Sequence, residues 1–411
     1  MQTAELPVPI VKGKGALVFD ERGRSYIDAI SSWWVNLHGH AHPFIAKKIA
    51  EQAAKLEHII FAGFTHEGAV SLGEQLLKIL PGNQRKVFYS DNGSTAVEVA
   101  LKMSFQYWRN RGKSKTKVIA FENAYHGDTF GSMSVSGRGL FTKPFESLLF
   151  DVIHIPAPFH GNEKKSFTAF RNAAKRKDIA AFIFEPLVMG AAGMQMYGNE
   201  SLDVLLSFSA ERNILTIADE VFTGFGRTGR LFAVDYLTQK PDIICLSKGI
   251  TGGFMPLGAT TCTDKIYRGF LSNDDTKTFF HGHSYTANPL ACAAALASIN
   301  LLKSSVCRHQ IQYITGRHSA FAQKIARHPA VKNVRFTGTI MAIEIRTKES
   351  DSYLNSSREF FYNFFIRKGI IMRPLGNIIY FLPPYCIREK EINYVYRSIA
   401  ESLEQFKKKF T

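Results

Sequence analysis

Residues 86–108 read KVFYSDNGSTAVEVALKMSFQYW, and this stretch combines a strand, a turn and a helix. The apolar run at its start predicts a buried strand. A polar turn containing Gly93 follows, and a helix is predicted to begin at Ser94 or Thr95, with Thr95 and Glu98 at capping-box spacing. Backbone N–H groups at such a helix start suit a phosphate, as does the Ser94 hydroxyl. Taken alone, an ordinary strand–helix turn is the simpler interpretation.

The same alternation of apolar runs and helical patterns extends from about residue 66 to residue 250. The runs are almost continuously apolar, which is typical of strands buried on both faces of a mostly parallel sheet. The alternation itself predicts an α/β domain. The predicted strands are Val87–Ser90, Lys117–Phe121, Val152–Ile155, Ala181–Phe184, Ile214–Ala218 and Ile243–Leu246, and the predicted helices include Gly68–Leu80 and Ser201–Arg212.

Beyond residue 290 the pattern changes to short strands and helices, which predicts a smaller α+β lobe. We expect the N-terminal residues to complete this lobe. The predicted domains are therefore residues 40–290 for the large α/β domain, and residues 1–39 with 291–411 for the small one. The predicted elements of the C-terminal part are helix Ala291–Leu302, strand Thr339–Ile345, helix Ser357–Lys368, a hairpin around Leu375–Asn377 and helix Lys390–Phe406.

The composition is that of a globular protein, with 45% hydrophobic and 21% charged residues among 411. No apolar run reaches bilayer-spanning length, and the N-terminus has no pattern of a secretory signal. The cysteines are odd in number, widely spaced and never in a CxxC pair, which favours reduced thiols and a cytoplasmic location. They are Cys245, Cys262, Cys292, Cys307 and Cys386.

The formal net charge of +16 raises nucleic-acid binding as an alternative. The densest basic cluster lies in a polar segment between a predicted helix and a predicted strand, without interleaved aromatic residues. A run of three lysines ends the C-terminal helix, where cations suit the helix dipole. We therefore expect solvated cations, and neither nucleic acid nor a membrane as partner. The cluster comprises Arg109, Arg111, Lys113, Lys115 and Lys117, and the run is Lys407–Lys409.

Residues 214–229 read ILTIADEVFTGFGRTG and place Asp219 at the end of an apolar run. Open α/β sheets bind ligands at this end of their strands. A buried acid needs a partner, and the ring nitrogen of a pyridoxal cofactor, a helix N-terminus or a protein cation would each serve. Gly224–Gly229 matches GxGxxG, but no strand runs directly into it and no clear helix follows. A dinucleotide site is therefore not expected.

Residues 241–253 read PDIICLSKGITGG and place Lys248 just after the apolar run Ile243–Leu246. A lysine at such an edge, beneath a cofactor, can be desolvated to a lower pKa and form an imine. For any single lysine, a solvated head group is the commoner situation. The order of a phosphate turn, an acid and a lysine, each after a buried strand, favours the catalytic interpretation.

Several further segments complete this pattern: Ser31-Ser32-Trp33-Trp34, Asn92-Gly93-Ser94, Tyr125-His126-Gly127-Asp128, Asp219-Glu220, Gly224–Gly229, Ser247-Lys248-Gly249, His281-Gly282-His283-Ser284 and Arg373-Pro374. Together and in this order they resemble the class III aminotransferases, and within them the branch of biotin synthesis. The resemblance covers nearly the whole chain. It implies the type I fold of pyridoxal 5'-phosphate enzymes, with a large, mostly parallel sheet domain and a smaller α+β lobe.

The resemblance also implies the residues that hold the cofactor. Gly93 and Ser94 would bind its phosphate, and Asp219 would pair with its ring nitrogen. Lys248 would be the catalytic residue, holding the cofactor as a Schiff base and moving the proton. Tyr125 would lie along the pyridine ring and contact substrate.

The supporting and substrate-binding residues follow from the same resemblance. Asp128 would support the region of Asp219, and Trp33 and Trp34 would line the substrate site. Arg373 would clamp a substrate carboxylate. Its apolar surroundings agree with that role because a guanidinium there binds a carboxylate bidentately, although a structural Arg–Glu pair is the alternative.

A loop shared between subunits is the last implication. Gly282, His283 and Ser284 resemble the loop that reaches across a homodimer, with His283 and Ser284 at the phosphate and Gly282 at the substrate. The partners expected are thus small-molecule substrates and a second copy of the chain.

The expected reaction is the conversion of 8-amino-7-oxononanoate to 7,8-diaminononanoate with S-adenosylmethionine as amino donor, by a ping-pong route. Two alternatives stay open. His281–Tyr285 also resembles relatives that use lysine as donor, and a broader omega-aminotransferase is the third possibility.

Two other features lie in the N-terminal part of the sequence. His38, His40 and His42 form HxHxH, but no carboxylate or cysteine accompanies them, so polar packing is preferred over a metal site. The family has a Trp-His-Pro-Tyr-like N-terminal stretch whose tyrosine contacts substrate, and this sequence starts at Met1–Thr3 without it. We expect a version extended upstream to bind substrate better.

Overall fold

The computed structural model describes residues 7–349 and 355–410 of the chain, so the start at Met1–Thr3 lies outside the described residues. The chain forms two compact units. Residues 48–300 make up the large unit, and residues up to 47 together with those from 301 onward make up the small unit. The domain division at residues 40 and 290 stays a prediction.

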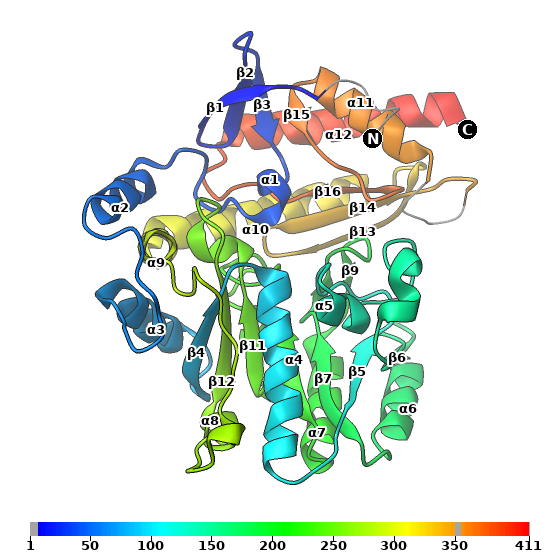
Figure 1. Ribbon diagram of the computed structural model, residues 1–411. Helices are drawn as coiled ribbons and strands as arrows, with labels where there is room; N and C mark the ends of the chain where they lie inside the picture. Colours follow the sequence, from blue (N-terminus) through cyan, green and yellow to red (C-terminus); the bar gives the residue numbers. More distant parts are fainter. Residues whose placement is uncertain (1–6, 350–354, 411) are drawn as a thin grey trace. The chain divides into compact units, whose positions relative to one another are not determined.

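The large unit is built on a mostly parallel sheet, as the apolar runs predict (Figure 1). Among the described residues, seven strands follow the order β4-β12-β11-β10-β7-β5-β6. The pairs that link β11, β10, β7, β5 and β6 are parallel, and β12 is antiparallel to both of its neighbours. The strands are β4 (Gln84–Ser90), β5 (Lys117–Phe121), β6 (Val152–Ile155), β7 (Ile179–Phe184), β10 (Leu215–Asp219), β11 (Ile243–Leu246) and β12 (Gly258–Thr263).

The antiparallel strand β12 is absent from the sequence prediction because its residues, GATTCT, are not a strongly apolar run. Thr260 and Thr261 are nevertheless buried. The Thr260 hydroxyl donates to the Ala96 carbonyl at 2.7 Å, and the Thr261 hydroxyl donates to Gln84 Oε1 at 2.8 Å. Satisfied hydroxyl groups can lie inside a core at little cost, so a polar sequence forms an internal strand.

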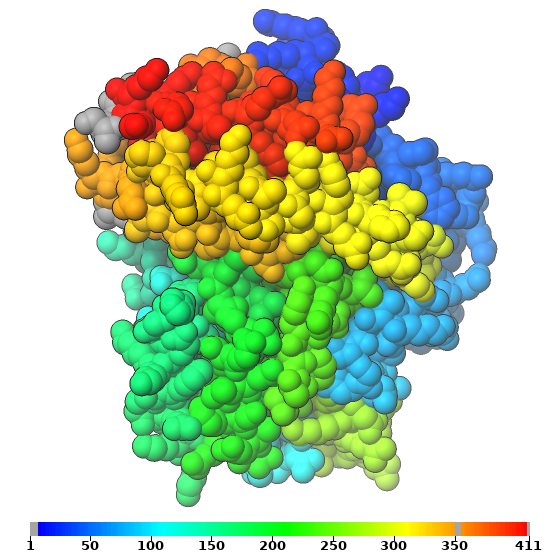
Figure 2. Space-filling model, turned by 180° about the vertical axis from the view of Figure 1, so that it is seen from behind, coloured from blue at the N-terminus to red at the C-terminus, as the bar shows by residue number. Residues whose placement is uncertain are grey.

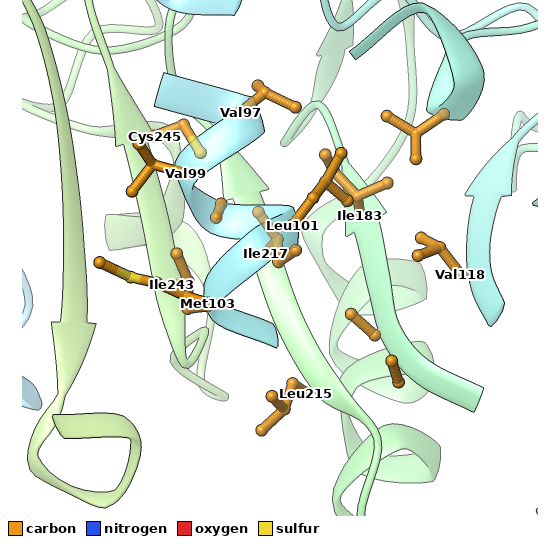
Figure 3. Close-up of a cluster of buried hydrophobic side chains, with 14 of the residues drawn as sticks. Val97, Val99, Leu101, Met103, Val118, Ile183, Leu215, Ile217, Ile243 and Cys245 are labelled. Atoms are coloured by element: carbon orange, nitrogen blue, oxygen red, sulfur yellow. The ribbon is translucent and has the colours of Figure 1, made fainter. Parts of the chain in front are cut away.

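Helix α4 (Gly93–Asn110) supplies the core of the large unit by crossing one face of the sheet (Figure 1). Its apolar side chains pack onto those of β11, β10, β7 and β5 (Figure 3). Full burial of one such aliphatic side chain stabilises the fold by about 1.5–3 kcal/mol. The residues labelled in Figure 3 are Val97, Val99, Leu101, Met103, Val118, Ile183, Leu215, Ile217, Ile243 and Cys245.

The remaining elements around the large unit are mostly short. The further helices wholly within residues 48–300 are α3 (Glu67–Ile79), α5 (Phe130–Val135), α6 (Glu163–Ala173), α7 (Asn199–Glu211) and α8 (Asp264–Arg268), whereas α2 (Pro43–Ala53) and α9 (Pro289–Leu302) cross the two ends of that range. Short 3₁₀ helices span Lys143–Leu148, Ala233–Tyr236, Lys248–Thr251 and Asp275–Lys277, and a two-stranded ribbon joins β8 (Val188–Met189) to β9 (Gln195–Met196).

The start of α4 differs from the prediction. The helix begins at Gly93, and its capping box uses Asn92 and Thr95. The Asn92 side chain accepts from the Thr95 N–H at 3.0 Å, and Thr95 Oγ1 accepts from the Asn92 N–H at 3.1 Å. Glu98 is not part of the box, because its carboxylate accepts from donors at the start of α5, including the Gly131 N–H at 2.7 Å. The predicted Thr95–Glu98 pairing was therefore wrong.

The small unit is an α+β structure drawn from both ends of the chain (Figure 1). Among the described residues, one sheet has the order β1-β2-β3-β15 and another has the order β13-β14-β16. Strand β15 is parallel to β3, so the two chain ends share a sheet. The strands are β1 (Ile10–Lys14), β2 (Leu17–Asp20), β3 (Ser25–Asp28), β13 (Val331–Thr337), β14 (Ile340–Ile345), β15 (Ile370–Ile371) and β16 (Ile378–Phe381).

The predicted hairpin around Leu375–Asn377 was wrong in its extent. An isolated bridge joins Leu375 to Ile378, but β15 pairs with β3 whereas β16 pairs with β14. The strands on either side of the turn thus belong to different sheets. Pro374 has no N–H with which to extend a ladder between them.

The helices of the small unit are α1 (Ser31–Trp34), α10 (Ser305–Ile325), α11 (Ser357–Arg367) and α12 (Glu389–Phe410). Helix α12, red in Figure 2, lies along α10, in yellow. The rings of Phe321 and Tyr396 stack between them with centroids 4.2 Å apart. No single described helix has the length and apolarity of a membrane span, although α9 and α10, bent by 69°, meet both criteria as a pair.

The segment labelled α1 is a left-handed turn. The φ angles of Ser31, Ser32, Trp33 and Trp34 are 52°, 46°, 67° and 76°. Residues with a Cβ disfavour this region by roughly 1–2 kcal/mol each. No glycine eases the turn, so the surrounding structure must hold it.

Candidate active site

The ends of two neighbouring strands bring Asp219 and Lys248 to one edge of the sheet. Strands β10 and β11 are parallel, and Asp219 lies opposite Cys245 in their register. Lys248 lies shortly after Cys245 in the sequence, just beyond the end of β11, where the 3₁₀ helix Lys248–Thr251 begins. The predicted acid thus ends one strand and the predicted lysine follows the neighbouring strand, at the edge where ligands bind in open α/β sheets.

Lys248 is held in a strained and poorly solvated position. Its φ of 42° lies in the left-handed region, which a residue with a Cβ adopts only where the surroundings enforce it. The pKa of its ammonium group is lowered, mainly because water is excluded from it, while Asp219 and Glu185 act in the opposite direction. A lysine with a lowered pKa has more of the neutral, nucleophilic amine at neutral pH.

Asp219 is a buried carboxylate with two described contacts. Its Oδ2 lies 2.7 Å from His126 Nδ1, and its Oδ1 accepts from the Val221 N–H at 3.1 Å. His126 is itself buried, and Ser136 Oγ accepts from the backbone N–H of His126 at 2.9 Å. Among the described residues, none bonds His126 Nε2. The imidazole therefore orients the carboxylate from one side.

His126 was not among the predicted site residues, although it belongs to the Tyr125-His126-Gly127-Asp128 motif. Asp128 was expected to support the region of Asp219. Its described contacts are instead with Tyr125, whose hydroxyl donates to Asp128 Oδ2 at 2.7 Å, and with Ser94, whose Oγ accepts from the Asp128 N–H at 3.2 Å. Burial raises the pKa of the Tyr125 hydroxyl, and the bond to Asp128 adds to this.

Glu185 is a second site residue that the sequence prediction did not include. It directly follows β7, much as Asp219 ends β10, and that position was the available signal. Its carboxylate accepts from the Tyr125 N–H at 3.0 Å and from the Gly190 N–H at 2.9 Å. Burial raises its pKa to about 7, with His126 opposing the shift and Asp219 adding to it.

We expect Glu185→Gln to flatten the pH dependence of stability. The native carboxyl has a pKa of about 7 against an ordinary 4.5, so between these values the folded state keeps a proton that the unfolded state releases. Stability therefore falls as pH rises through this window, by at most about 1.4 kcal/mol per pH unit for one group. Glutamine does not titrate, so this share of the slope disappears.

Urea unfolding of both proteins at pH 5, 6 and 7 checks this prediction. Glu220, whose pKa is also raised to about 7 by burial, keeps its own contribution in both proteins. The expected result is thus a smaller slope in the variant. An equal slope in the two proteins would show that Glu185 is ionised in the fold.

The turn before α4 brings backbone close to the proposed phosphate site. The first turn of a helix has N–H groups without intrahelical acceptors. Here the Asn92 side chain accepts a hydrogen bond from the Thr95 N–H. A Cβ on Gly93 would lie 2.7 Å from Val221 Cγ1, so the backbone at Gly93 lies closer to the Val221 side chain than a residue with a Cβ allows. Ser94 and Gly93 thus occupy positions suited to an anion.

Gly127 is required by both space and backbone conformation. Its φ is 134°, and a Cβ there would lie 2.2 Å from Ser94 Oγ and 2.6 Å from Ser132 Oγ. We expect Gly127→Ala to destabilise the fold by about 1–3 kcal/mol and to displace the Ser94 hydroxyl. Gly139→Ala is the matched control, since nothing lies within 4 Å of its Cβ position. Equal urea midpoints for the two variants would contradict this prediction.

The predicted inter-subunit loop is largely exposed in the single chain. Gly282 and Ser284 are exposed, and His283 is half-buried with its Nδ1 3.3 Å from Asp91 Oδ2. Thr286 closes the loop, because its hydroxyl donates to the His283 carbonyl at 2.8 Å.

Trp33, Trp34 and Arg373 all belong to the small unit. The Arg373 guanidinium lies over the Trp33 ring, with Cζ 4.3 Å from the ring centroid. Trp33 is 54% exposed, whereas Trp34 is buried against the edge of Tyr380, with centroids 6.2 Å apart. The structure thus brings Trp33 and Arg373 together and places Trp34 in the core.

Comparison with known proteins places this arrangement in a family. The family model for class III aminotransferases matches residues 1–403. The chain is 48% identical to the adenosylmethionine-8-amino-7-oxononanoate aminotransferase of Synechococcus elongatus over 97% of this chain and 95% of that protein. It is 38% identical to the protein of the same name from Geobacter sulfurreducens, over 97% of this chain and 92% of that protein.

Two solved structures show the same fold. The adenosylmethionine-8-amino-7-oxononanoate aminotransferase of Methanocaldococcus jannaschii superimposes with a TM-score of 0.93 at 36% identity, over 98% of this chain and 94% of that one. An amine transaminase from an uncultivated Pseudomonas species, in its PLP-bound form, gives a TM-score of 0.92 at 27% identity, over 97% and 95% of the two chains. The chain belongs to the class III aminotransferases.

Proposed function

We propose that this chain is the aminotransferase that converts 8-amino-7-oxononanoate to 7,8-diaminononanoate in biotin biosynthesis, with S-adenosylmethionine as amino donor. The observation that carries the proposal is the 48% identity, across nearly the full length of both chains, to a protein named for this acceptor and donor. The amine transaminase has almost the same fold at 27% identity, so the fold supports the reaction class and the sequence supports the substrates.

Pyridoxal 5'-phosphate is the cofactor, and the residues of the large unit fit it. Lys248 offers a partly desolvated amine, Asp219 a buried carboxylate, and Gly93 and Ser94 the start of a long helix. When bound, the cofactor supplies a protonated ring that accepts electrons from the amino carbon of a substrate. Asp219 would hold the proton of the ring nitrogen, and the α4 N-terminus would hold the phosphate.

The residues of the chain divide the remaining work. His126 Nδ1 keeps the Asp219 carboxylate in one orientation at 2.7 Å. The Lys248 Nζ removes a proton from the amino carbon of the donor and returns one to the acceptor, a role that its lowered pKa favours. Tyr125 is fixed by Asp128 through its hydroxyl and by Glu185 through its N–H, so its ring keeps one place.

Arg373 and Trp33 would recognise the acceptor in this proposal. The acceptor ends in a carboxylate, which Arg373 would bind bidentately. Trp33 presents a large exposed aromatic surface directly beside that guanidinium. An apolar chain next to a carboxylate matches this pair of groups.

A donor-by-acceptor screen tests the proposal. S-adenosylmethionine, lysine and alanine are each offered with 8-amino-7-oxononanoate and with pyruvate to the purified holoenzyme, and the aminated product is measured. Turnover of 8-amino-7-oxononanoate with S-adenosylmethionine is expected. Turnover with lysine instead would assign the donor suggested by His281–Tyr285, and turnover of alanine with pyruvate in place of 8-amino-7-oxononanoate would indicate a broader omega-aminotransferase.

We further propose a homodimer with shared active sites, in which Gly282–Ser284 completes the site of the other subunit. Large apolar side chains flank this loop in exposed positions, with Phe280 75% and Tyr285 63% exposed. A second exposed group comprises Leu140, Phe141, Phe145 and Leu148. Monomeric proteins rarely expose apolar residues in such groups, so a partner surface is indicated.

Mixing two inactive variants tests the shared site. A Lys248→Ala chain keeps its loop, and a Ser284→Glu chain keeps its lysine. If sites are shared, co-refolded chains form mixed dimers with one complete site and regain part of the activity. Activity that stays at the level of the separate variants would contradict the proposal.

We place the enzyme in the cytoplasm, supported by five cysteines that are all free thiols.

A further inference from the structure

The left-handed turn Ser31–Trp34 is held by a buried carboxylate. Asp28, at the end of β3, has no exposed surface. Its Oδ2 accepts from the Ser32 hydroxyl at 2.8 Å and lies 2.9 Å from His40 Nε2, and its Oδ1 accepts from the Ile30 N–H at 3.2 Å. A buried charge is costly unless it is hydrogen-bonded, so these contacts stabilise the carboxylate and the turn together.

The backbone of the turn is fixed at both of its ends. The Ser31 hydroxyl donates to the Leu382 carbonyl at 2.7 Å, which anchors the start of the turn to the segment after β16. The N–H groups of Val35 and Asn36 both donate to the Ser31 carbonyl at 3.0 Å, which closes its end. The four strained residues therefore have hydrogen bonds that hold both ends of the turn. Asp28 binds the second of these residues, Ser32.

The backbone of His40 is held in place by Gly15, and this places the imidazole beside Asp28. Its N–H donates to the Gly15 carbonyl at 2.8 Å, and its carbonyl accepts from the Gly15 N–H at 3.2 Å. A Cβ on Gly13 would lie 2.5 Å from His40 Cβ, so the chain passes His40 where only glycine fits. This contact gives a structural role to the middle histidine of the HxHxH pattern.

The turn presents Trp33 at the place where Arg373 emerges. Strands β3 and β15 are parallel, with Asp28 opposite Ile371. Both strands therefore end at the same edge of their sheet, one leading to Trp33 and the other to Arg373. The guanidinium lies 4.3 Å from the centre of the Trp33 ring, a distance typical of a cation–π contact.

We propose that Asp28, Ser32 and His40 are positioning residues that hold the Trp33 ring against Arg373, and thereby select acceptors with a carboxylate at the end of an apolar chain. The inference rests on the proposed function and deepens it. Stacking uses the face of the guanidinium, whereas a carboxylate binds at its edge, so the two contacts are compatible. A released turn would separate the ring from the cation and weaken recognition of the carboxylate without altering the groups around Lys248.

The test compares 8-amino-7-oxononanoate with its methyl ester in the holoenzyme. We expect Asp28→Asn to lower the ratio of kcat/KM for the acid to kcat/KM for the ester about tenfold, through a higher KM for the acid. General damage to the fold would instead lower both values together. If Asp28→Asn does not fold, His40→Ala carries the same comparison, because its backbone bonds to Gly15 do not need the imidazole.

A suppressor separates turn geometry from other effects of the mutation. Glycine adopts positive φ at no steric cost, so Ser32→Gly should restore the acid-to-ester ratio of Asp28→Asn. Ser32→Ala is the matched control, since it also removes the hydroxyl but keeps the Cβ. An unchanged ratio in Asp28→Asn, or equal ratios in the two double variants, would overturn the proposal.

Tryptophan fluorescence gives a readout that does not depend on the reaction. The sequence has three tryptophans, of which Trp33 is 54% exposed while Trp34 and Trp108 are buried. Acrylamide quenching thus reports mainly on Trp33. The degree of quenching should change in Asp28→Asn and should return to the wild-type value in the variant that also carries Ser32→Gly. If the wild type turns over neither the acid nor the ester, the proposed function fails, and quenching still decides whether Asp28 holds the turn.

Discussion

Replacing Lys248 with alanine is expected to lower turnover by about 10⁴-fold or more and to abolish the visible absorbance of the bound cofactor. The desolvated amine of Lys248 is the group proposed for both the covalent attachment and the proton transfer, so its removal abolishes both. The absorbance spectrum of the purified protein and its rate with S-adenosylmethionine and 8-amino-7-oxononanoate measure the two effects.

Lys265→Ala is the control for this experiment. Lys265 follows β12, about half exposed, and its Nζ lies 3.5 Å from Asp242 Oδ1. Its removal should leave spectrum and rate close to those of the wild type. A Lys248→Ala protein that keeps the band and the rate would show that another amine holds the cofactor.

Replacing Asp219 with asparagine is the second change with a large expected effect. The amide keeps the shape of the side chain but cannot hold the ring nitrogen in its protonated form. Loss of one partner of a buried charged pair costs about 3–5 kcal/mol, which corresponds to a decrease in kcat of about 10²- to 10³-fold or more. The cofactor should still be attached through Lys248, so the visible band is kept with altered intensity or position.

Asp235→Asn is the matched control, because Asp235 is another partly buried acid of the large unit with a raised pKa. Its carboxylate accepts from the Phe232 N–H at 2.9 Å, so its loss should lower stability and leave kcat little changed. Equal decreases in kcat for the two variants would mean that Asp219 has no special relation to the cofactor.

The strands of the large unit were predictable because most of them are buried on both faces. Such strands are continuous apolar runs, and β5, β6 and β11 have the predicted bounds. Strand β12 was not predictable by the same signal, since Thr260 and Thr261 are buried with hydrogen bonds to residues far away in the sequence. The pairing of β15 with β3 likewise depends on partners at opposite ends of the chain.

Asp219 and Lys248 were signalled by their position after buried strands, whereas Tyr125 and the loop at Ser284 followed only from the family resemblance. Asp219 and Lys248 each follow an apolar run, and the structure places Asp219 at the end of β10 and Lys248 just after the adjacent strand β11. The contact of His126 with Asp219 joins residues 93 positions apart, and no local pattern specifies it. The roles carried over for Gly93, Ser94, Tyr125 and the loop at Ser284 stay predictions, as do those of Trp33 and Arg373.

The left-handed turn is the feature furthest from sequence reasoning. Ser31-Ser32-Trp33-Trp34 has no glycine or asparagine to mark positive φ, so every local preference points to another conformation. The turn exists because Asp28 and the Leu382 carbonyl hold it after the fold is complete. Local strain imposed by contacts from outside the strained segment is a common sign of a functional position.

The sheet shared by the two chain ends has a consequence during synthesis on the ribosome. Ile27 pairs with Ile370, so β3 lacks its neighbour until most of the chain has been made. At about 5–20 residues per second, the nascent N-terminal segment waits roughly 20 to 70 s for that strand. During this time the side chains of Val18, Tyr26 and Ile27, buried in the final structure, have no complete core to enter. The large unit, residues 48–300, is synthesised in the meantime, and the N-terminal segment is the part of the nascent chain on which a holding chaperone would act.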